Sequence, residues 1–393
     1  MNFNNKIIQL FSNSFIAKLL MKDVILLNSN PPMCDNAYYV YKEILNRKLN
    51  DKFKLVWIVS KNNEKCSVNE KNVLFVSKEQ KLKYSYYRIF SKYIMDCNPF
   101  ILKTNKYQTR IYLSHSCPVK ELKELHQSGG HIDYLISCSS FWNDIWKKLY
   151  SGSNLVKEYV IAGLPRNDTF FDRSQWKILF PEIEREKTIL WLPTYRNHKT
   201  KRNFEQYTDI HFPLGLPCLD DIEQVKELNN YLKEAKSILV IKPHPAQDLT
   251  EIKELDFSNI KLIDNSYFEE DTTLYNYLPS IDALITDYSS VYWDFLLADK
   301  PVGLAIPDFE QYTQHIKIPY DYEKCVIGIR ILSYNDLRSF IKSVVNNEDL
   351  YKSERNKNLS VYHKYVDGNA SKRVVDLFED IISKKKDKDE KSN

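Results

Sequence analysis

The chain has 393 residues, of which 43% are hydrophobic and 27% charged, and its 56 basic and 52 acidic residues leave a formal net charge of +4. A single core stops growing at roughly 250–300 residues, so this length predicts two domains, and the balanced charge gives no general attraction for nucleic acid. Only 8 residues are glycine, and none of them forms the glycine-rich signature of a dinucleotide-binding enzyme, a P-loop NTPase or a G-x-S-x-G hydrolase.

The N-terminal segment is apolar but too short to span a membrane, which takes ~20 apolar residues. Lys18 interrupts any signal-peptide core and no small-residue cleavage site follows it. The sequence therefore predicts a cytoplasmic protein. A helix over residues 5–22 is expected either to pack on its own domain or to lie in a membrane interface. Its apolar positions recur at helical spacing: Ile7, Ile8, Phe11, Phe15 and Leu19.

In the first half of the chain, short β-branched and aromatic runs alternate with amphipathic stretches such as Ala37–Leu49 and Phe141–Tyr150. This alternation is typical of βαβ units and a parallel sheet. The expected strands are Val24–Ser29, Leu55–Ser60, Val73–Ser77, Ile111–His115, Tyr134–Cys138 and Tyr159–Gly163.

The same pattern restarts after a polar, proline-bounded connection over Pro165–Lys187 and ends in a helical region over Tyr334–Lys384. We therefore expect an α/β protein of two doubly wound, Rossmann-like domains facing across a cleft, with residues 1–187 in the first and 188–393 in the second, which ends in a basic tail at 384–393. The expected strands of the second sheet are Thr188–Leu192, Ile238–Lys242, Ile260–Ile263, Ala283–Thr286 and Pro301–Ala305.

Three strand ends of the second half carry polar residues. Ligands bind at the carboxyl ends of strands in open α/β sheets, so these positions are candidates for a site. Ser289 and Ser290 offer two hydroxyl groups to a phosphate, or they simply cap a helix. Prolines on both sides of His244 restrict the backbone at that strand end. Lys242 or Arg196 could neutralise a pyrophosphate.

The first half offers one counterpart, His115 at the end of an expected strand. A histidine is the natural proton acceptor near neutral pH, although local hydrogen bonds would explain it equally well. Arg166, in the turn after the last strand of that domain, is a second candidate. These residues alone indicate a phosphate-bearing ligand.

Cysteine and histidine patterns give no sign of a metal or disulfide framework. The 7 cysteines are odd in number and form no C-x-x-C pair, which suits a reducing compartment. No H-E-x-x-H occurs, and the one D-x-D, over residues 387–389, lies in the tail. We expect neither a cofactor nor a metal.

The order of the motifs resembles the CDP-glycerol glycerophosphotransferase family, whose members build teichoic acids and related capsule polymers. The region of Asp35, Asn36 and Ala37 also fits the family's N-terminal pattern. The resemblance spans roughly residues 24 to 380. It rests on six ordered segments: His115–Lys120, Gly163–Asp168, Leu192–Arg196, Lys242–Pro245, Ile285–Asp294 and Asp367–Arg373.

The resemblance implies a metal-independent GT-B fold, a CDP-alditol donor bound mainly by the C-terminal domain, and an acceptor entering from the N-terminal side. It assigns catalysis to His115 as general base and to His244, which with the two serines would stabilise charge on the pyrophosphate. The residues implied in binding the CDP-alditol are Ser116, Cys117, Pro118, Val119, Arg166, Pro193, Thr194, Lys242, Pro243, Ser289, Ser290 and Asp294.

The implied reaction transfers glycerol phosphate or ribitol phosphate to a hydroxyl of a lipid-linked or glycan acceptor, with release of CMP, on the inner face of the cell membrane. The family's usual His-Gly-Thr-Pro-Leu-Lys reads His-Ser-Cys-Pro-Val-Lys over His115–Lys120, which leaves the identity of the alditol open. The choice between a primase and a polymerase stays open as well. The alternatives are a GT-B nucleotide-sugar glycosyltransferase and a non-catalytic nucleotide-binding relative.

Overall fold

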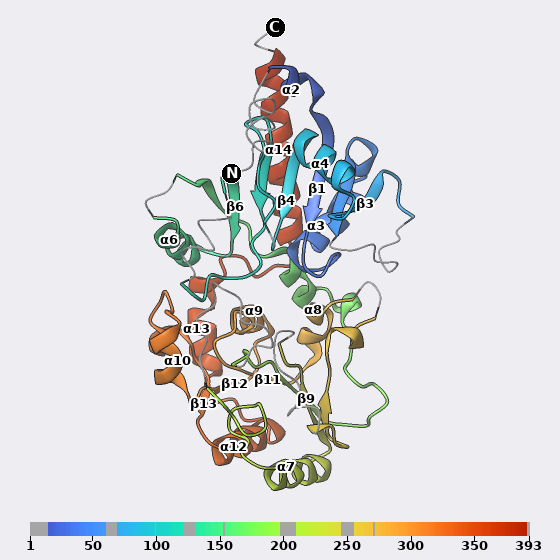
Figure 1. The fold of residues 1–393 in the computed structure, drawn as a ribbon. Helices are drawn as coiled ribbons and strands as arrows, with labels where there is room; N and C mark the ends of the chain where they lie inside the picture. Colours follow the sequence, from blue (N-terminus) through green and yellow to red (C-terminus); the bar gives the residue numbers. More distant parts are fainter. Residues whose placement is uncertain are drawn as a thin grey trace. The chain divides into compact units, whose positions relative to one another are not determined.

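The structure is a computed structural model that describes residues 15–59, 69–98, 100–121, 130–151, 154–196, 210–244, 255–269 and 272–390. It divides into two compact units (Figure 1). The first unit comprises residues 1–117, 122–171 and 363–393, and the second comprises residues 118–121 and 172–362. The chain thus enters the second unit and returns to the first.

The first unit is built on a seven-stranded sheet in the order β3-β2-β1-β4-β5-β6-β7, with every pair parallel. Its central strands are almost wholly buried, as expected when helices cover both faces of a parallel sheet. The strands are β1 (Lys22–Asn28), β2 (Lys54–Val59), β3 (Val73–Ser77), β4 (Ser91–Asp96), β5 (Thr109–Tyr112), β6 (Ile132–Ser137) and β7 (Val156–Ile161).

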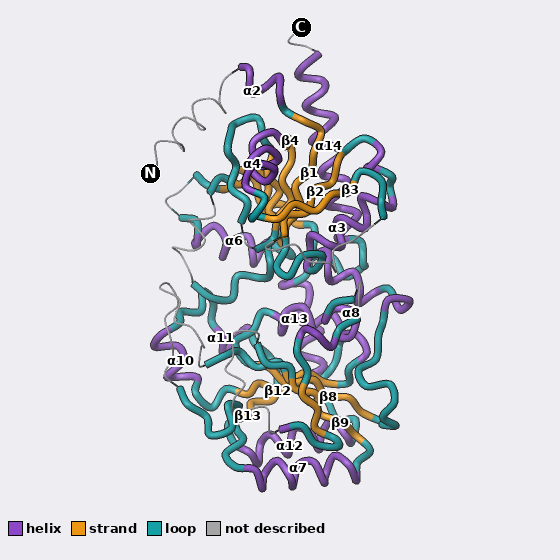
Figure 2. Tube along the Cα trace, turned by 45° about the vertical axis from the view of Figure 1, so that its right-hand side comes forward, coloured by secondary structure: helices purple, strands orange, loops and turns teal. Residues whose placement is uncertain are grey.

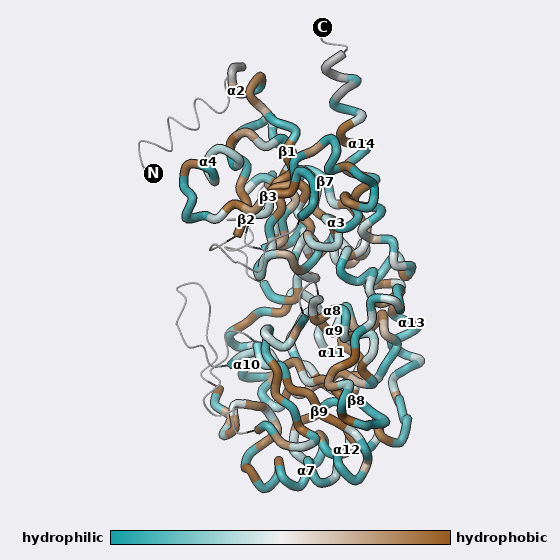
Figure 3. Tube along the Cα trace, turned by 90° about the vertical axis from the view of Figure 1, so that its right-hand side faces the viewer, coloured by the Kyte–Doolittle hydropathy of each residue, from teal (hydrophilic) through white to brown (hydrophobic). Residues whose placement is uncertain are grey.

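Helices lie on both faces of this sheet: Figure 3 shows α4 on one side of β1–β3 and α3 with α14 on the other. The Phe378 ring of α14 packs against the rings of Phe53 and Tyr93, at centroid distances of 5.4 and 4.9 Å. The helical elements are α2 (Phe15–Leu20), α3 (Asp35–Asn46), η1 (Leu49–Asp51), α4 (Lys81–Phe90), α6 (Ser140–Leu149), η2 (Pro165–Phe171) and α14 (Ala370–Glu390).

The second unit repeats the design with a six-stranded parallel sheet in the order β10-β9-β8-β11-β12-β13. Counted within each unit, both sheets place the third, second, first and fourth strands side by side in that order, which is the Rossmann arrangement. The strands are β8 (Lys187–Trp191), β9 (Ser237–Ile241), β10 (Ile260–Leu262), β11 (Ala283–Thr286), β12 (Val302–Ala305) and β13 (Ile329–Ile331).

One face of the second sheet is covered by α7 and α12, which lie together below the strands in Figure 2 and bury a continuous apolar core with them. On the opposite side α9 packs against β11. The helical elements are η3 (Arg173–Gln175), α7 (Ile222–Glu234), η5 (Asn265–Tyr267), α8 (Leu274–Tyr277), η6 (Leu278–Ser280), α9 (Val291–Phe295), η7 (Leu296–Ala298), α10 (Phe309–His315), α11 (Tyr322–Cys325), α12 (Tyr334–Val345) and α13 (Lys352–Tyr362).

The predicted pair of doubly wound parallel sheets is confirmed, but the units do not divide at residue 187. Residues 172–187 belong to the second unit and residues 363–393 to the first. The reason for the return is packing, because α14 contacts α3 and η2 and buries Phe378 completely. The expected basic tail is part of α14 as far as Glu390.

Strands β4 and β13 were not predicted from the sequence. Lys92 and Asp96 interrupt the apolar run of β4, yet Asp96 is buried in an ion pair with Arg110 at 2.8 Å. Most of the expected helix at residues 5–22 lies outside the described residues; its part over Phe15–Leu20 is helical. Within the described part of the chain, no helix is long and apolar enough to cross a membrane.

Candidate functional site

Each sheet has one switch point, between β1 and β4 in the first unit and between β8 and β11 in the second. Strand order reverses there, so the loops leaving the carboxyl ends of neighbouring strands diverge and leave room for a ligand. The sequence-predicted residues lie in the segments that follow β1, β5 and β7 in the first unit and β8, β9 and β11 in the second.

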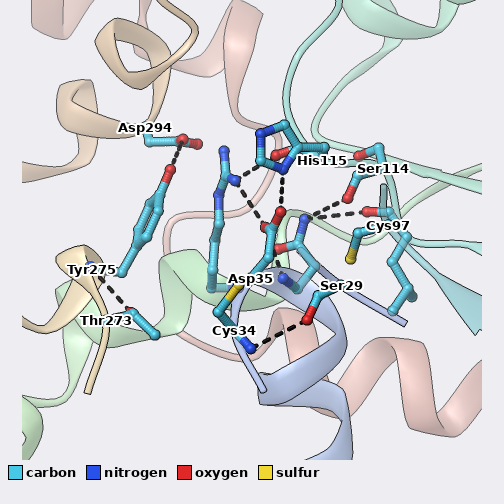
Figure 4. Close-up of polar contacts among 12 residues, drawn as sticks. Ser29, Cys34, Asp35, Cys97, Ser114, His115, Thr273, Tyr275 and Asp294 are labelled. Carbon is cyan, nitrogen blue, oxygen red and sulfur yellow. Dashed lines mark hydrogen bonds and ion pairs between the residues drawn. The ribbon is translucent and has the colours of Figure 1, made fainter. Parts of the chain in front are cut away.

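In the first unit, Asp35, His115 and Arg166 meet around one carboxylate (Figure 4). Asp35 Oδ2 lies against Nδ1 of His115 in a short contact. Arg166 Nη1 donates to Asp35 Oδ1 at 2.8 Å and also to the backbone carbonyl oxygen of His115. Asp35 begins α3 after β1, His115 lies in the loop after β5, and Arg166 lies in η2 after β7, so only the folded sheet brings them together.

The backbone at these loops is specialised. Asp35 and Ser114 have φ angles of 58° and 53°, in the left-handed region that non-glycine residues seldom occupy. The side chain of Asn36 holds the neighbouring segments in place. Its Nδ2 donates to the carbonyl oxygens of Leu113 at 3.2 Å and Ser114 at 2.9 Å, and its Oδ1 accepts from the amide of Arg166 at 3.0 Å.

Burial and charge act in opposite directions on Asp35. Burial alone would raise the pKa of its carboxyl, but His115 and Arg166 outweigh that effect and lower the pKa to about 2. The carboxylate is therefore ionised at neutral pH. The imidazole of His115 is 54% exposed, so it meets solvent while one of its nitrogens faces the buried carboxylate. This combination suits a proton acceptor.

The residues after His115 divide between the units. Ser116 is half-buried and Cys117 is buried in the first unit, whereas Pro118 and Val119 are buried in the second. Lys120 Nζ lies 5.7 Å from the ring centroid of Tyr312 in the second unit.

Two motifs of the first unit dock on each other. The carboxylate of Asp168 accepts from the amides of Ala370 and Ser371 at 2.8 Å each and so caps the first turn of α14. Gly163 has a φ of 84°, and a Cβ there would meet Cβ of Ala370 at 3.2 Å. The segments Gly163–Asp168 and Asp367–Arg373 therefore anchor the returning C-terminal helix.

In the second unit, Lys242 and His244 follow β9 as expected. Burial lowers the pKa of Lys242 to about 8, although the nearby carboxylate of Asp264 acts in the opposite direction. The ring of His244 is exposed and lies 4.7 Å from the ring of Tyr195. Pro243, between the two, is buried.

A buried ion network occupies the switch point of the second unit. Arg196 binds Asp287 at 2.9 Å and Asp308 at 2.6 Å. The Thr194 hydroxyl donates to Asp287 at 2.6 Å, and the Tyr288 hydroxyl donates to Asp308 at 3.0 Å. The expectation that Arg196 could neutralise a pyrophosphate does not fit this structure, because its guanidinium is buried and paired with two carboxylates. Pro193 is also buried here.

The paired serines stand at the start of α9. Ser290 occupies the N-cap position of α9, but its side chain makes no capping hydrogen bond. Ser289 Oγ accepts one long hydrogen bond, of 3.4 Å, from the amide of Val291. Both are half-buried. Asp294 is 1% exposed and accepts from the hydroxyl of Tyr275 at 2.7 Å (Figure 4).

Sequence reasoning did not identify the roles of Asp35, Asp308 or Tyr275. For Asp35 a signal existed, because an Asp-Asn pair follows the first strand at the expected switch point. Asp308 bonds to Arg196, 112 positions away, and Tyr275 bonds to Asp294, 19 positions away. No motif in the local sequence predicts either contact. Among the described residues, no group of three or more His, Cys, Asp or Glu side chains could hold a metal ion.

Comparison with known proteins gives consistent matches. The chain is 26% identical to the teichoic acid poly(glycerol phosphate) polymerase of Bacillus spizizenii, over 87% of each chain. It is also 26% identical to the teichoic acid poly(ribitol-phosphate) polymerase of the same organism, covering 90% of this chain but only 55% of that longer relative. A solved structure of the wall teichoic acid polymerase TagF superposes with a TM-score of 0.68 at 17% identity, covering 97% of this chain and 93% of that one.

The last match shows the GT-B fold, as predicted. The family itself is identified by sequence, since residues 10–380 match the description CDP-glycerol:poly(glycerophosphate) glycerophosphotransferase. That match covers most of the chain and all six motifs. The chain therefore belongs to the CDP-glycerol:poly(glycerophosphate) glycerophosphotransferase family.

Proposed function

We propose that this chain transfers glycerol phosphate or ribitol phosphate from a CDP-alditol to a hydroxyl of a lipid-linked or glycan acceptor, with release of CMP, in the synthesis of a teichoic acid-like or capsular polymer. Family membership supports this reaction class, and relatives named for both alditols support both donors. The observation that carries the proposal in the structure is the exposed imidazole of His115 against the buried carboxylate of Asp35.

In the proposed reaction His115 is the general base. The acceptor O–H bond breaks, and its proton goes to Nε2 of His115. The acceptor oxygen forms a bond to the β-phosphorus of the donor. The bond from that phosphorus to the bridging oxygen breaks, and CMP leaves with the oxygen. Transfer of this kind needs mainly positioning and charge stabilisation.

The donor pyrophosphate is proposed to bind the second unit through Lys242, His244, Ser289 and Ser290. Lys242 supplies a positive charge beside the switch point, and the Ser290 hydroxyl makes no capping hydrogen bond. The acceptor is proposed to bind the first unit, with Ser116 and Cys117 next to the base. Pro193, Thr194 and Pro243 are proposed to support the donor loops, since they are buried or hydrogen-bonded within them. Asp294 is proposed to support the start of the neighbouring helix α9, where it accepts from Tyr275 of α8.

We also propose peripheral attachment of the first unit to the inner face of the membrane. Leu19 of α2 is 69% exposed, and a groove of about 1120 Å³ lies at the amino ends of β1 and β4–β7. Apolar and basic groups together favour an anionic lipid surface. Lysines that line the groove are Lys18, Lys52, Lys92, Lys106, Lys157, Lys384 and Lys385. Sedimentation with vesicles of anionic lipid should fall for Lys52→Glu with Lys157→Glu, and an unchanged bound fraction would count against this surface.

The nucleotide released tests the reaction. The purified chain is incubated with CDP-glycerol or CDP-ribitol and a lipid-linked acceptor, and the products are separated by chromatography. The proposal predicts CMP that appears only when an acceptor is present. Release of a nucleoside diphosphate from a nucleotide sugar would support a glycosyltransferase instead. Tight CDP binding without turnover of any CDP-alditol would support a non-catalytic relative.

A further inference from the structure

We infer that Asp35 is a positioning residue that fixes the tautomer of His115, and that Arg166 serves this base by holding Asp35 rather than by contacting the donor. The inference deepens the proposed function and rests on it for the role of His115 as general base. It departs from the assignment of Arg166 to the donor site that the family resemblance implied. The inference is based on the contacts of the two carboxylate oxygens of Asp35.

The two oxygens of Asp35 have separate tasks. Oδ1 accepts from Arg166 Nη1 and from the amide of Asn36, both at 2.8 Å. Oδ2 faces Nδ1 of His115. An ionised carboxylate can only accept hydrogen bonds, so Nδ1 must carry the hydrogen. In the neutral imidazole, Nε2 then has the free lone pair, which is the state that a general base needs.

Arg166 is placed to hold the carboxylate. Its side chain is 4% exposed, and Nη1 is shared between Asp35 and the carbonyl oxygen of His115. Its own amide is bound by Asn36. If the guanidinium of Arg166 moved away to bind a phosphate, the buried carboxylate of Asp35 would lose its cation. An uncompensated buried charge of this kind is costly in free energy. Arg166 therefore keeps Asp35 ionised and fixes its orientation.

The surrounding backbone makes the arrangement rigid. Asp35 and Ser114 both have left-handed backbone conformations, and non-glycine residues in such conformations persist only where the surroundings determine them. The Asn36 side chain supplies that constraint, since it bonds to the backbone of Leu113, Ser114 and Arg166. The carboxylate and the imidazole consequently meet in one geometry without a ligand.

Asp35→Asn and Asp35→Ala test the inference because they give opposite orders under the two explanations. In Asp35→Asn, the two donors at the Oδ1 position fix the amide oxygen there, so the NH₂ group faces Nδ1 of His115. Nδ1 must then accept, the hydrogen moves to Nε2, and the base is lost. In Asp35→Ala the ring is free to adopt either tautomer.

We expect kcat to fall by about 10²–10⁴-fold in the asparagine variant and by less in the alanine variant. The KM for the CDP-alditol should stay within about twofold of the wild-type value, because the base acts in the chemical step and not in ground-state binding of the donor.

A merely structural Asp35 would give the reverse order, because asparagine preserves shape and alanine leaves a cavity. Asp51→Asn, which removes an exposed partner of Lys71, is the control and should leave kcat unchanged.

For Arg166, the conservative Arg166→Lys variant separates the two roles. Support of the base predicts a lower kcat with an unchanged KM for the donor. A rise in that KM of tenfold or more at unchanged kcat would overturn the assignment and place Arg166 on the phosphate.

A second readout does not depend on turnover. Long-range ¹H–¹⁵N spectra of the ¹⁵N-histidine-labelled chain report which ring nitrogen carries the hydrogen, and the signals of His115 are those missing in His115→Asn. We expect the Nδ1–H form in the wild type and the Nε2–H form in Asp35→Asn. An Nε2–H form in the wild type, or no change in the variant, would overturn the positioning role. If the spectra agree while no CDP-alditol is turned over, only the proposed function fails.

Discussion

Both units place an arginine among carboxylates at the switch point of a parallel sheet, but the two clusters are built for different ends. In the first unit, one carboxylate, Asp35, is shared between Arg166 and the exposed imidazole of His115. In the second, Arg196 is held by Asp287 and Asp308 and covered by tyrosine rings, with Tyr288 at 5.0 Å.

The two clusters differ in the number of carboxylates that hold the arginine, one for Arg166 and two for Arg196. Asp287 and Asp308 together hold the guanidinium of Arg196, and each also accepts from a hydroxyl group, so this buried arginine is committed to partners within the unit. In the first unit a single carboxylate, Asp35, meets both Arg166 and the imidazole of His115, which is 54% exposed. An arginine at a strand end can therefore be structural or chemical, and the side chains that hold it distinguish the two roles.

The largest expected effect is a difference in the loss of unfolding free energy when the arginine of each cluster is replaced by methionine. Arg196→Met leaves Asp287 and Asp308 buried without their cation, and losing one partner of a buried pair costs about 3–5 kcal/mol. Arg166→Met leaves Asp35 with His115 as a remaining partner, so the expected loss is about half as large. The free energy of unfolding, measured in urea by tryptophan fluorescence, tests this order. Equal losses would contradict the distinction between the clusters.

The acid stability of the first cluster comes next. The pKa of Asp35 in the folded chain, about 2, is below the usual 3.8 of an aspartate side chain. Its contribution to stability is therefore present above about pH 4 and is lost as the pH falls through about 2. The shift corresponds to about 2 kcal/mol at neutral pH, of which roughly half remains at pH 3. The difference in unfolding free energy between wild type and Asp35→Asn should shrink accordingly, and a difference that does not change with pH would refute the assignment.

A smaller effect is expected at the serines of the second unit. Ser290→Ala removes a hydroxyl that does not cap α9, so the thermal midpoint should hardly change. If the hydroxyl binds a charged phosphate oxygen, its loss should raise the donor KM about tenfold. Ser339→Ala, in which the lost hydroxyl only bonds to Asn335 on α12, is the matched control. A donor KM that is unchanged in both variants would remove Ser290 from the donor site.

The smallest expected effect is a pH dependence at Lys242. Its pKa, lowered by burial to about 8, means that the free chain loses this positive charge as the pH rises through about 8. Affinity for CDP should therefore fall several-fold between pH 7 and pH 9, as expected for the loss of one charge partner of a phosphate. Lys242→Arg stays charged and should show no such fall. Parallel losses in both proteins, measured by calorimetry, would show that another group is responsible.

Much of the fold follows from local sequence. The strand Ala283–Thr286 is predicted with its observed limits, because four apolar or β-branched residues stand between Asp282 and Asp287. β4 is missed because Lys92 and Asp96 leave only three apolar residues between them. Buried Asp96 is tolerated because Arg110 pairs with it and the amide of Ile101 donates to it. Return of α14 to the first unit likewise depends on contacts with residues more than 200 positions earlier, such as the cap from Asp168.

The site divides in the same way. His115, Lys242 and the serine pair are found from the sequence because they follow strands. Whether an arginine holds a ligand or another side chain depends on partners 91 and 112 residues away for Arg196 and 131 away for Arg166. Composition and spacing carry no information about those distances in space. The role of Asp35 is visible only once the loops after β1, β5 and β7 are brought together.

The central claim is that the exposed imidazole of His115 acts in chemistry and not in donor binding. Single-turnover release of CMP from CDP-glycerol or CDP-ribitol, in the presence of acceptor, tests it in wild type and His115→Asn side by side, together with CDP affinity by calorimetry. We predict a rate about 10²–10⁴-fold lower in the variant, as expected for loss of a general base, with CDP affinity within about twofold. A variant that releases CMP within a few-fold of the wild-type rate would contradict the claim.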